Sequence, residues 1–100
     1  MSESYITDLS AESVRVLLSK PIMQELADGV VMRAPTVFDI RLASKSACTD
    51  EDRELQLFAA LTGIAVIDLE QFLLSDYQRL QHGYFLMVSG RPEKNEAADE

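Results

Sequence analysis

The sequence MRAPTVFD, residues 32–39, marks the change from strand to helix in this chain. Pro35 has no backbone N–H, so a strand that reaches it must end there. Thr36 has the side chain of a good helix N-cap, and Asp39, three residues later, completes a capping box for the first free N–H groups of a helix. We therefore expect a strand before Pro35 and a helix from Thr36 onward.

Upstream of this junction, two segments show the alternation typical of half-buried strands. Apolar side chains stand at every second position in residues 13–18, and residues 29–34 have a similar pattern. The two segments are expected to pair as an antiparallel hairpin. Between them, Asp28-Gly29 is a turn signal, but residues 21–27 fit one or two turns of helix equally well, so both geometries stay open.

Downstream of the junction, the apolar period lengthens to that of amphipathic helices. Thr49 or Asp50 begins one helix with several acidic residues in its first turn, where negative charge is favoured, and Gly63 suits its C-terminal end. Asp68 and Ser75 are the expected N-caps of two further helices. The fold class is therefore α+β, an N-terminal antiparallel β-hairpin followed by a small bundle of three to four helices. The expected helices cover about residues 36–47, 50–62, 68–74 and 75–88.

Length and charge distribution indicate one domain with polar ends. A chain of 100 residues has room for a single hydrophobic core. Both ends are rich in acidic residues, which act there as a solubilising fringe. We expect a flexible acidic N-terminal tail at 1–12, a single domain at 13–89 that begins with the hairpin at 13–34, and a disordered polar C-terminal tail at 90–100.

Composition argues against nucleic acid and membrane partners. The formal net charge is −8, which repels phosphate backbones and anionic lipid surfaces. The apolar runs are far shorter than the ~20 residues that cross a bilayer, and the N-terminus lacks the basic start and apolar run of a secretory signal. We therefore expect a cytoplasmic protein that binds neither nucleic acid nor membranes.

Residues that could carry chemistry are few and scattered. His82 is the one histidine of the sequence and has neither a nucleophile nor an orienting carboxylate nearby, so we expect it to face solvent on a helix. Cys48 lacks a second thiol for a disulfide, a redox pair or a metal site. Capping of helix starts explains the carboxylates of Asp39, Asp68 and Asp76. The sequence thus predicts no catalytic residue, no metal site and no cofactor, and we do not expect an enzyme.

Four short elements in a fixed order resemble one known family. They are Leu-Ser-Lys-Pro-Ile at 18–22, the junction at 32–39, Leu-Phe-Ala-Ala-Leu-Thr-Gly at 57–63, and the stretch at 69–77 that ends in Asp-Tyr. Their order and spacing are similar to those of the tail assembly chaperone family of Mu-like and related contractile-tailed (myo-type) phages. Ala34 departs from the pattern, because an acidic residue is common there in the family. The resemblance marks as family-motif positions Lys20, Pro21, Ile22, Arg33, Pro35, Thr36, Asp39, Gly63, Asp76 and Tyr77.

The resemblance implies a role in tail assembly. A family member of this kind binds the tape measure protein and keeps it soluble and competent for tail tube polymerisation. The tail tube protein, a frameshifted longer form of the chain and further copies of the chain itself are additional candidate partners. The implied location is the cytoplasm of the bacterial host, and the protein is not expected in the mature virion. Arg33 is expected to pair with Asp39 or with Asp76.

The expected partner is a long helical protein with apolar stripes that would aggregate until the tube encloses them. We hypothesise that apolar helix side chains beyond those the core needs bind such a stripe by helix-in-groove contacts. For each of these side chains, burial in the core is the competing interpretation. The candidates are Phe58, Phe72, Leu73, Tyr77, Leu80, Tyr84 and Phe85.

Other classes of function stay open. The chain has the size, charge and amphipathic helices of another small acidic chaperone or adaptor. A structural subunit of a phage tail or tail-like particle is a further alternative. A small regulatory protein would need a basic DNA-binding face, which the sequence lacks, and an enzyme ranks last.

Overall fold

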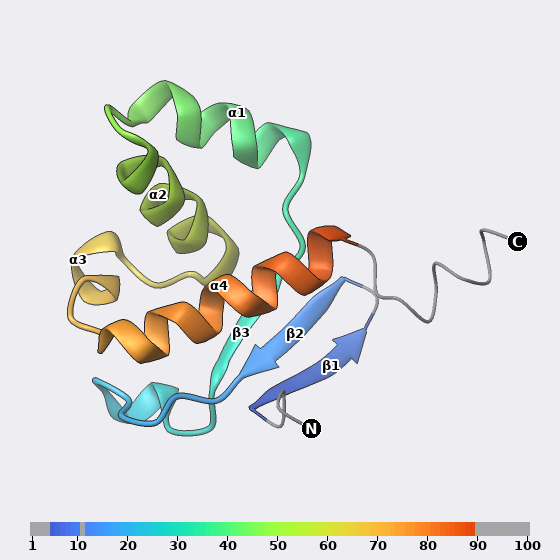
Figure 1. Cartoon of the computed structure of the whole chain (residues 1–100), viewed down its shortest axis with the longest axis vertical. Helices are drawn as coiled ribbons and strands as arrows, with labels where there is room; N and C mark the ends of the chain where they lie inside the picture. Colours follow the sequence, from blue (N-terminus) through green and yellow to red (C-terminus); the bar gives the residue numbers. More distant parts are fainter. Residues whose placement is uncertain (1–4, 11, 90–100) are drawn as a thin grey trace, which may run out of the picture.

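Strands at the N-terminal end and helices after them form an α+β fold in the computed structural model, which describes residues 5–10 and 12–89 (Figure 1). Within these residues, a three-stranded antiparallel sheet in the order β1-β2-β3 precedes four α-helices. The predicted fold class is confirmed. The expected disordered tail at 90–100 lies outside the described residues. The elements are β1 Ile6–Ser10, β2 Ser13–Val16, the 3-10 helix η1 Gln24–Leu26, β3 Val30–Arg33, α1 Val37–Ser46, α2 Asp50–Thr62, α3 Val66–Leu69 and α4 Leu74–Ser89.

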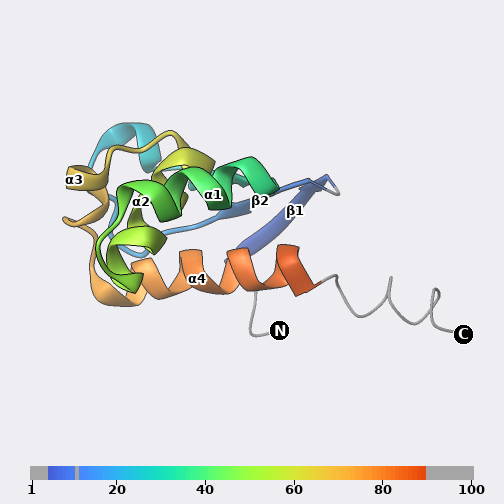
Figure 2. The same cartoon turned by 90° about the horizontal axis from the view of Figure 1, so that it is seen from above.

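The predicted hairpin is formed by β2 and β3, which pair with Val14 opposite Met32 and Val16 opposite Val30. These four side chains are buried, while their neighbours along each strand point outward, as the alternation predicts. Helix α4 packs against β2 and runs along one side of the domain (Figure 2). Gly83 permits this close approach, because a Cβ atom there would lie 3.1 Å from a methyl group of Val16.

The expectation of a flexible tail over residues 1–12 is wrong for Ile6–Ser10, which form the edge strand β1. Backbone pairing with β2 holds this strand, and the Leu17 N–H donates a further hydrogen bond of 2.7 Å to the Tyr5 carbonyl. The Tyr5 side chain also contacts α4: its hydroxyl is 2.9 Å from Nδ1 of His82, and the Arg79 guanidinium lies over its ring at 4.5 Å. His82 is therefore half-buried against Tyr5, and the prediction that it faces solvent is wrong.

The connection from β2 to β3 resolves the two geometries that the sequence left open. It contains a short helix and a turn: the 3-10 helix η1 buries Leu26, and the chain then turns at Gly29. Gly29 has a φ of +108°, and a Cβ atom there would meet the Arg15 side chain at 2.9 Å. Only glycine adopts this conformation without strain.

The helices begin at the predicted caps at two of the four starts. Thr36 caps α1 in the predicted capping box, and the Thr49 side chain caps α2 by accepting from the Asp52 N–H. Gly63 ends α2 in the left-handed conformation. Helix α4 begins at Leu74, so Ser75 lies inside its first turn and is not the N-cap that the sequence predicted.

Helix α3 differs from the prediction. It begins at Val66, its N-cap is Ala65 without a side-chain hydrogen bond, and it ends at Leu69. Asp68 therefore lies inside the first turn and is not the cap that the sequence predicted. The helix consists of a single turn whose apolar residue Leu69 enters the core, so tertiary packing fixes its position more than a capping signal does.

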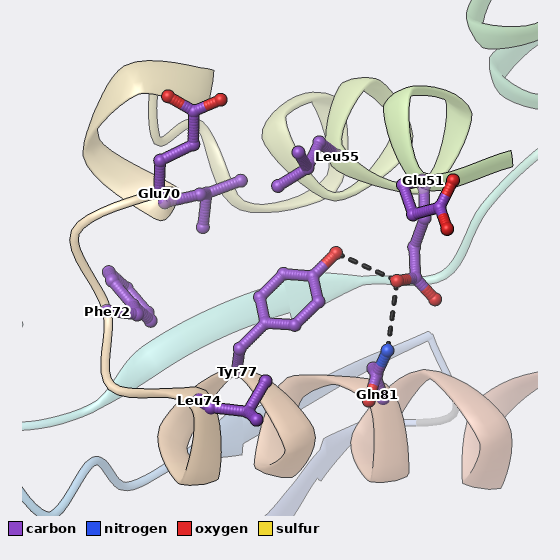
Figure 3. A pocket seen from close by; sticks show the side chains of 9 residues that line it. Glu51, Leu55, Glu70, Phe72, Leu74, Tyr77 and Gln81 are labelled. Atoms are coloured by element: carbon purple, nitrogen blue, oxygen red, sulfur yellow. Dashed lines mark hydrogen bonds between the residues drawn. The ribbon is translucent and has the colours of Figure 1, made fainter. Parts of the chain in front are cut away.

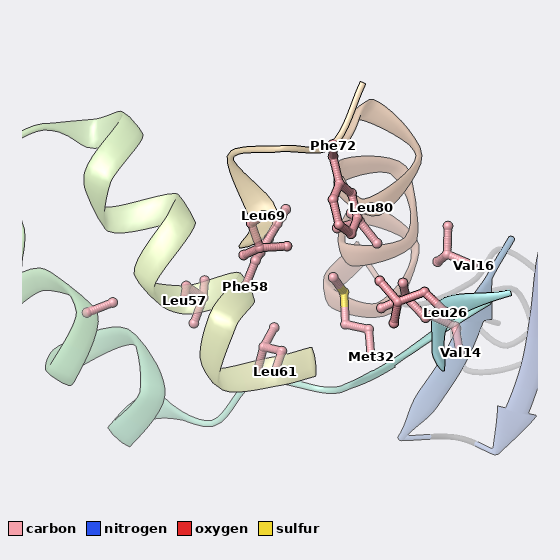
Figure 4. Packing of buried hydrophobic residues seen from close by; sticks show 12 residues of the cluster. Val14, Val16, Leu26, Met32, Leu57, Phe58, Leu61, Leu69, Phe72 and Leu80 are labelled. Carbon is pink, nitrogen blue, oxygen red and sulfur yellow. The ribbon is translucent and has the colours of Figure 1, made fainter. Parts of the chain in front are cut away.

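Buried side chains of the sheet and the helices form one hydrophobic core in the described part of the chain (Figure 4). Both strands of the hairpin contribute, and α2 supplies the largest buried ring. Burying a large apolar side chain of this kind stabilises a fold by about 1.5–3 kcal/mol. The core residues are Val14, Val16, Leu26, Val30, Met32, Ala43, Leu57, Phe58, Leu61, Leu69, Phe72 and Leu80.

Candidate protein-binding surface

The predicted junction between strand and helix is a closed polar cluster around Asp39, whose side chain is almost fully buried. Arg33 donates two hydrogen bonds to this carboxylate, of 2.8 and 3.0 Å, in the bidentate geometry that favours arginine. The Thr36 N–H donates a third, of 2.8 Å, and the Thr36 hydroxyl a fourth, of 3.1 Å. The hydrogen bonds from Arg33 and then from Thr36 hold the pKa of Asp39 well below its usual range. Of the two expected partners of Arg33, the structure thus selects Asp39.

Asp76 forms a second polar cluster, between the start of α4 and the chain after β2. Its side chain is 1% exposed and accepts hydrogen bonds from the Ser19 N–H at 2.8 Å, the Ser19 hydroxyl at 3.0 Å and the Lys20 N–H at 3.0 Å. Burial by itself would raise the pKa of Asp76, but the hydrogen bonds from Ser19 and Lys20, together with the nearby charge of Arg79, outweigh it and the pKa lies below its usual range. The sequence assigned this carboxylate to helix capping. Instead it joins segments that are 57 residues apart.

This arrangement gives the Lys-Pro-Ile motif a structural role. Lys20 contributes its backbone N–H to Asp76, while its side chain is exposed. Ile22, which follows Pro21, packs against the hydrophobic core from the outside. Ser19 was missed by the sequence analysis, because nothing local to it indicates a distant carboxylate. The two polar clusters therefore hold the fold together.

Tyr77 is half-buried between α4 and α2. Its hydroxyl donates to Oε1 of Glu54 at 2.9 Å, and its ring lies 5.5 Å from the ring of Phe58, measured between centroids. The same Glu54 oxygen accepts from the Gln81 side chain at 2.9 Å. Burial, and then the hydrogen bond to Glu54, raise the pKa of Tyr77 above its usual range.

The residues that the sequence offered for partner binding separate into two groups. Phe58 and Leu80 have no exposed surface and Phe72 is buried, so these three belong to the core. Leu73 and Phe85 are exposed, and Tyr77 and Tyr84 are half-buried. The exposed and half-buried members are available to a partner.

Helix α1 carries apolar surface that the sequence analysis did not single out. Val37 is 76% exposed and Phe38 66% exposed, and Leu42 is exposed as well, although α1 packs against α2. Only Asp39 and Ala43 of this helix are buried. The apolar residues surround more of α1 than one packed face requires, and this pattern was the sequence signal for an exposed apolar surface on the helix.

An apolar pocket opens between α2, the segment after α3 and the first turns of α4 (Figure 3). We call it the acid-rimmed pocket, because three glutamates, Glu51, Glu54 and Glu70, stand among its lining side chains. Its volume is about 430 Å³. Sequence reasoning assigned the acidic residues of α2 to the helix start and gave the pocket no role. The other lining residues are Leu55, Leu69, Phe72, Leu74, Tyr77 and Gln81.

Among residues 5–10 and 12–89, no group of three or more His, Cys, Asp or Glu side chains could hold a metal ion. Cys48 is exposed in the connection between α1 and α2. None of the described helices has the length and apolar character needed to cross a membrane.

Comparison with known families gives one match. The model of a family described as "Phage tail assembly chaperone proteins, E, or 41 or 14" matches residues 16–89. The match runs from the end of β2 to the end of α4 and includes both polar clusters. No curated protein and no solved structure matches the chain. Because the family model covers most of the sequence, the chain belongs to the phage tail assembly chaperone family.

Proposed function

We propose that this protein is the tail assembly chaperone of a contractile-tailed, Mu-like phage or prophage, and that it binds the tape measure protein and keeps it soluble. The observation that carries the proposal is the family match over residues 16–89. The match supports a role in tail assembly, and the proposal extends this role to a partner and a mode of action.

Exposed apolar side chains support the proposal that the chain binds an aggregation-prone partner and keeps it soluble. The hydrophobic core is filled by the sheet and the inner faces of the helices, yet large apolar groups remain outside on α1 and α4, such as Phe38 and Phe85. Single exposed apolar residues are common, but several on one short helix are typical of a protein-binding surface. A long helical protein with unprotected apolar stripes is the kind of partner that such a surface would keep from aggregating.

The proposed activity is non-enzymatic. The candidate acid and base groups of the sequence are engaged in holding the fold: Asp39 with Arg33, Asp76 with the chain at Ser19, and His82 with Tyr5. Chaperoning of a partner requires contact surface and no reaction. We further propose that the protein acts in the cytoplasm of the bacterial host and is absent from the mature virion.

A longer frameshifted form is compatible with this architecture. Helix α4 and the family match both end at residue 89. A different C-terminus from residue 90 onward would leave every described element in place. The two forms would then share one binding domain, and the extension would add contacts to the tail tube protein or to further copies of the chain.

Co-expression with the tape measure protein of the same genome tests the proposal. We expect the tape measure protein to be insoluble alone and soluble with this chain, and the two to co-purify through a tag on either one. An unrelated acidic protein of similar size serves as the control for a general solubilising effect. A tape measure protein that stays insoluble, or that is rescued equally by the control, contradicts the proposed function.

A further inference from the structure

The acid-rimmed pocket combines an apolar interior with unpaired negative charge at its edge (Figure 3). Leu55, Leu69 and Phe72 line it from α2, α3 and the segment before α4, and Leu74 stands at its edge with 71% of its surface exposed. A volume of about 430 Å³ lies within the range of about 300–1,000 Å³ that is typical of binding pockets. The pocket therefore has room for a large apolar side chain of a partner.

Two of the three glutamates have no side-chain partner among the described residues, although Glu51 lies in the first turn of α2, where its charge favours the helix. Glu54 is fixed in the pocket wall by the Tyr77 hydroxyl and the Gln81 amide, which both donate to it at 2.9 Å. The side chains of Glu51 and Glu70 form no hydrogen bond or ion pair with any part of the chain that the structure describes. Unpaired carboxylates beside an apolar pocket offer ion pairs to a cationic partner and repel an anionic one.

The charge of the chain favours a different protein over a second copy of the chain as the partner that binds in this pocket. The chain has a net charge of −8, so the approach of a second copy to an acidic rim is opposed by like charge. A helix with lysine or arginine one turn away from an apolar residue has the complementary pattern. Such a helix can place its apolar side chain in the pocket while its basic side chains reach the rim.

We infer that the acid-rimmed pocket is the docking site for a basic amphipathic helix of the tape measure protein, with one apolar side chain inside the pocket and basic side chains paired with Glu51 and Glu70. The inference rests on the proposed function and adds to it the location of the contact and the chemistry of the bound segment.

The test compares two double variants of the full chain. Glu51→Lys/Glu70→Lys reverses the charge of the pocket rim, and Glu12→Lys/Glu25→Lys makes the same change in net charge at two exposed glutamates that do not line the pocket. The tape measure protein of the same genome is the binding partner in both cases, and circular dichroism confirms that each variant is folded. Since like-charge contacts in an interface are costly, we expect the rim variant to bind at least about tenfold more weakly than the control variant.

The salt dependence of binding and a substitution in the apolar part of the pocket test the same docking site independently. Raising the salt concentration from about 0.05 to 0.5 M should weaken binding of the wild type more than binding of the rim variant, because screening acts on the pairs that the variant has lost. Leu74→Ser, which changes a mostly exposed residue, should also weaken binding by about tenfold while leaving the fold intact.

The possible outcomes separate the inference from the proposed function. If the wild type binds the tape measure protein and the rim variant binds as tightly as the control variant, the docking site is refuted and the chaperone function stands. If the rim variant changes the oligomeric state of the chain, and not its affinity for the tape measure protein, the pocket binds a second copy and the inference is wrong. If the wild type does not bind the tape measure protein at all, both fail together.

Discussion

Replacing Asp76 with asparagine should destabilise the fold by about 2–3 kcal/mol. The buried carboxylate accepts three hydrogen bonds from Ser19 and Lys20. A hydrogen bond to a charged group contributes roughly 1.5–3 kcal/mol net and a neutral one roughly 0.5–1.5, so loss of the charge costs about 1 kcal/mol per bond. Ser19 and Lys20 are exposed as whole residues, so water can form part of the hydrogen bonds that the asparagine no longer accepts. This lowers the expected loss of stability below the sum of the three bonds.

Urea unfolding followed by far-ultraviolet circular dichroism measures this loss, with Asp68→Asn as the matched control. Asp68 lies in α3, and its side chain makes no hydrogen bond or ion pair within the described residues. Substitutions at such sites usually change stability by less than about 0.5 kcal/mol. If Asp76→Asn were no more destabilising than Asp68→Asn, the account of Asp76 as the link between the 19–20 segment and α4 would be refuted.

The pKa values of Asp39 and Asp76 are lower in the folded state than the usual value near 4, so the folded state binds fewer protons at these residues than the unfolded state does. The free energy of unfolding should therefore be at its full value above about pH 5 and fall as the pH drops through and below about 4. Urea titrations at several pH values measure this dependence, and Asp39→Asn should make it weaker. Gly63→Ala should lower stability by about 1 kcal/mol, because the residue has a φ of +77° at the end of α2; an unchanged midpoint of thermal unfolding would contradict this explanation. Phe38→Ser should change stability by less than about 0.5 kcal/mol, since the ring is mostly exposed, yet reduce the yield of soluble tape measure protein on co-expression.

The sequence predicts those parts of the fold whose signals are local. The alternation around Val14 and Met32 and the capping box at Thr36 lie within a few residues of the structure that they determine, and the structure confirms both. Strand β1 gives no such signal, because its residues are mostly exposed and it is held by backbone pairing with β2. The position of β1 therefore depends on its pairing with β2 and not on a pattern in its own sequence.

Surfaces and long-range contacts are harder to predict than secondary structure. The hydrogen bonds from Ser19 to Asp76 join residues that have no pattern in common. The acid-rimmed pocket combines side chains from three separate segments, so Glu51 is recognisable in sequence only as part of an acidic helix start. The burial of Phe58 and the exposure of Phe85 likewise depend on how the helices pack, since both residues lie on apolar helix positions.

We propose that this chain binds the tape measure protein during assembly and is absent from the finished tail. Quantitative mass spectrometry of two samples from the same phage tests it most directly: complexes purified through the tape measure protein from cells without tube protein, and finished tails. We predict that the chain is abundant in the first sample and absent from the second. A stoichiometric amount of the chain in finished tails would contradict the claim and identify it as a structural subunit of the tail.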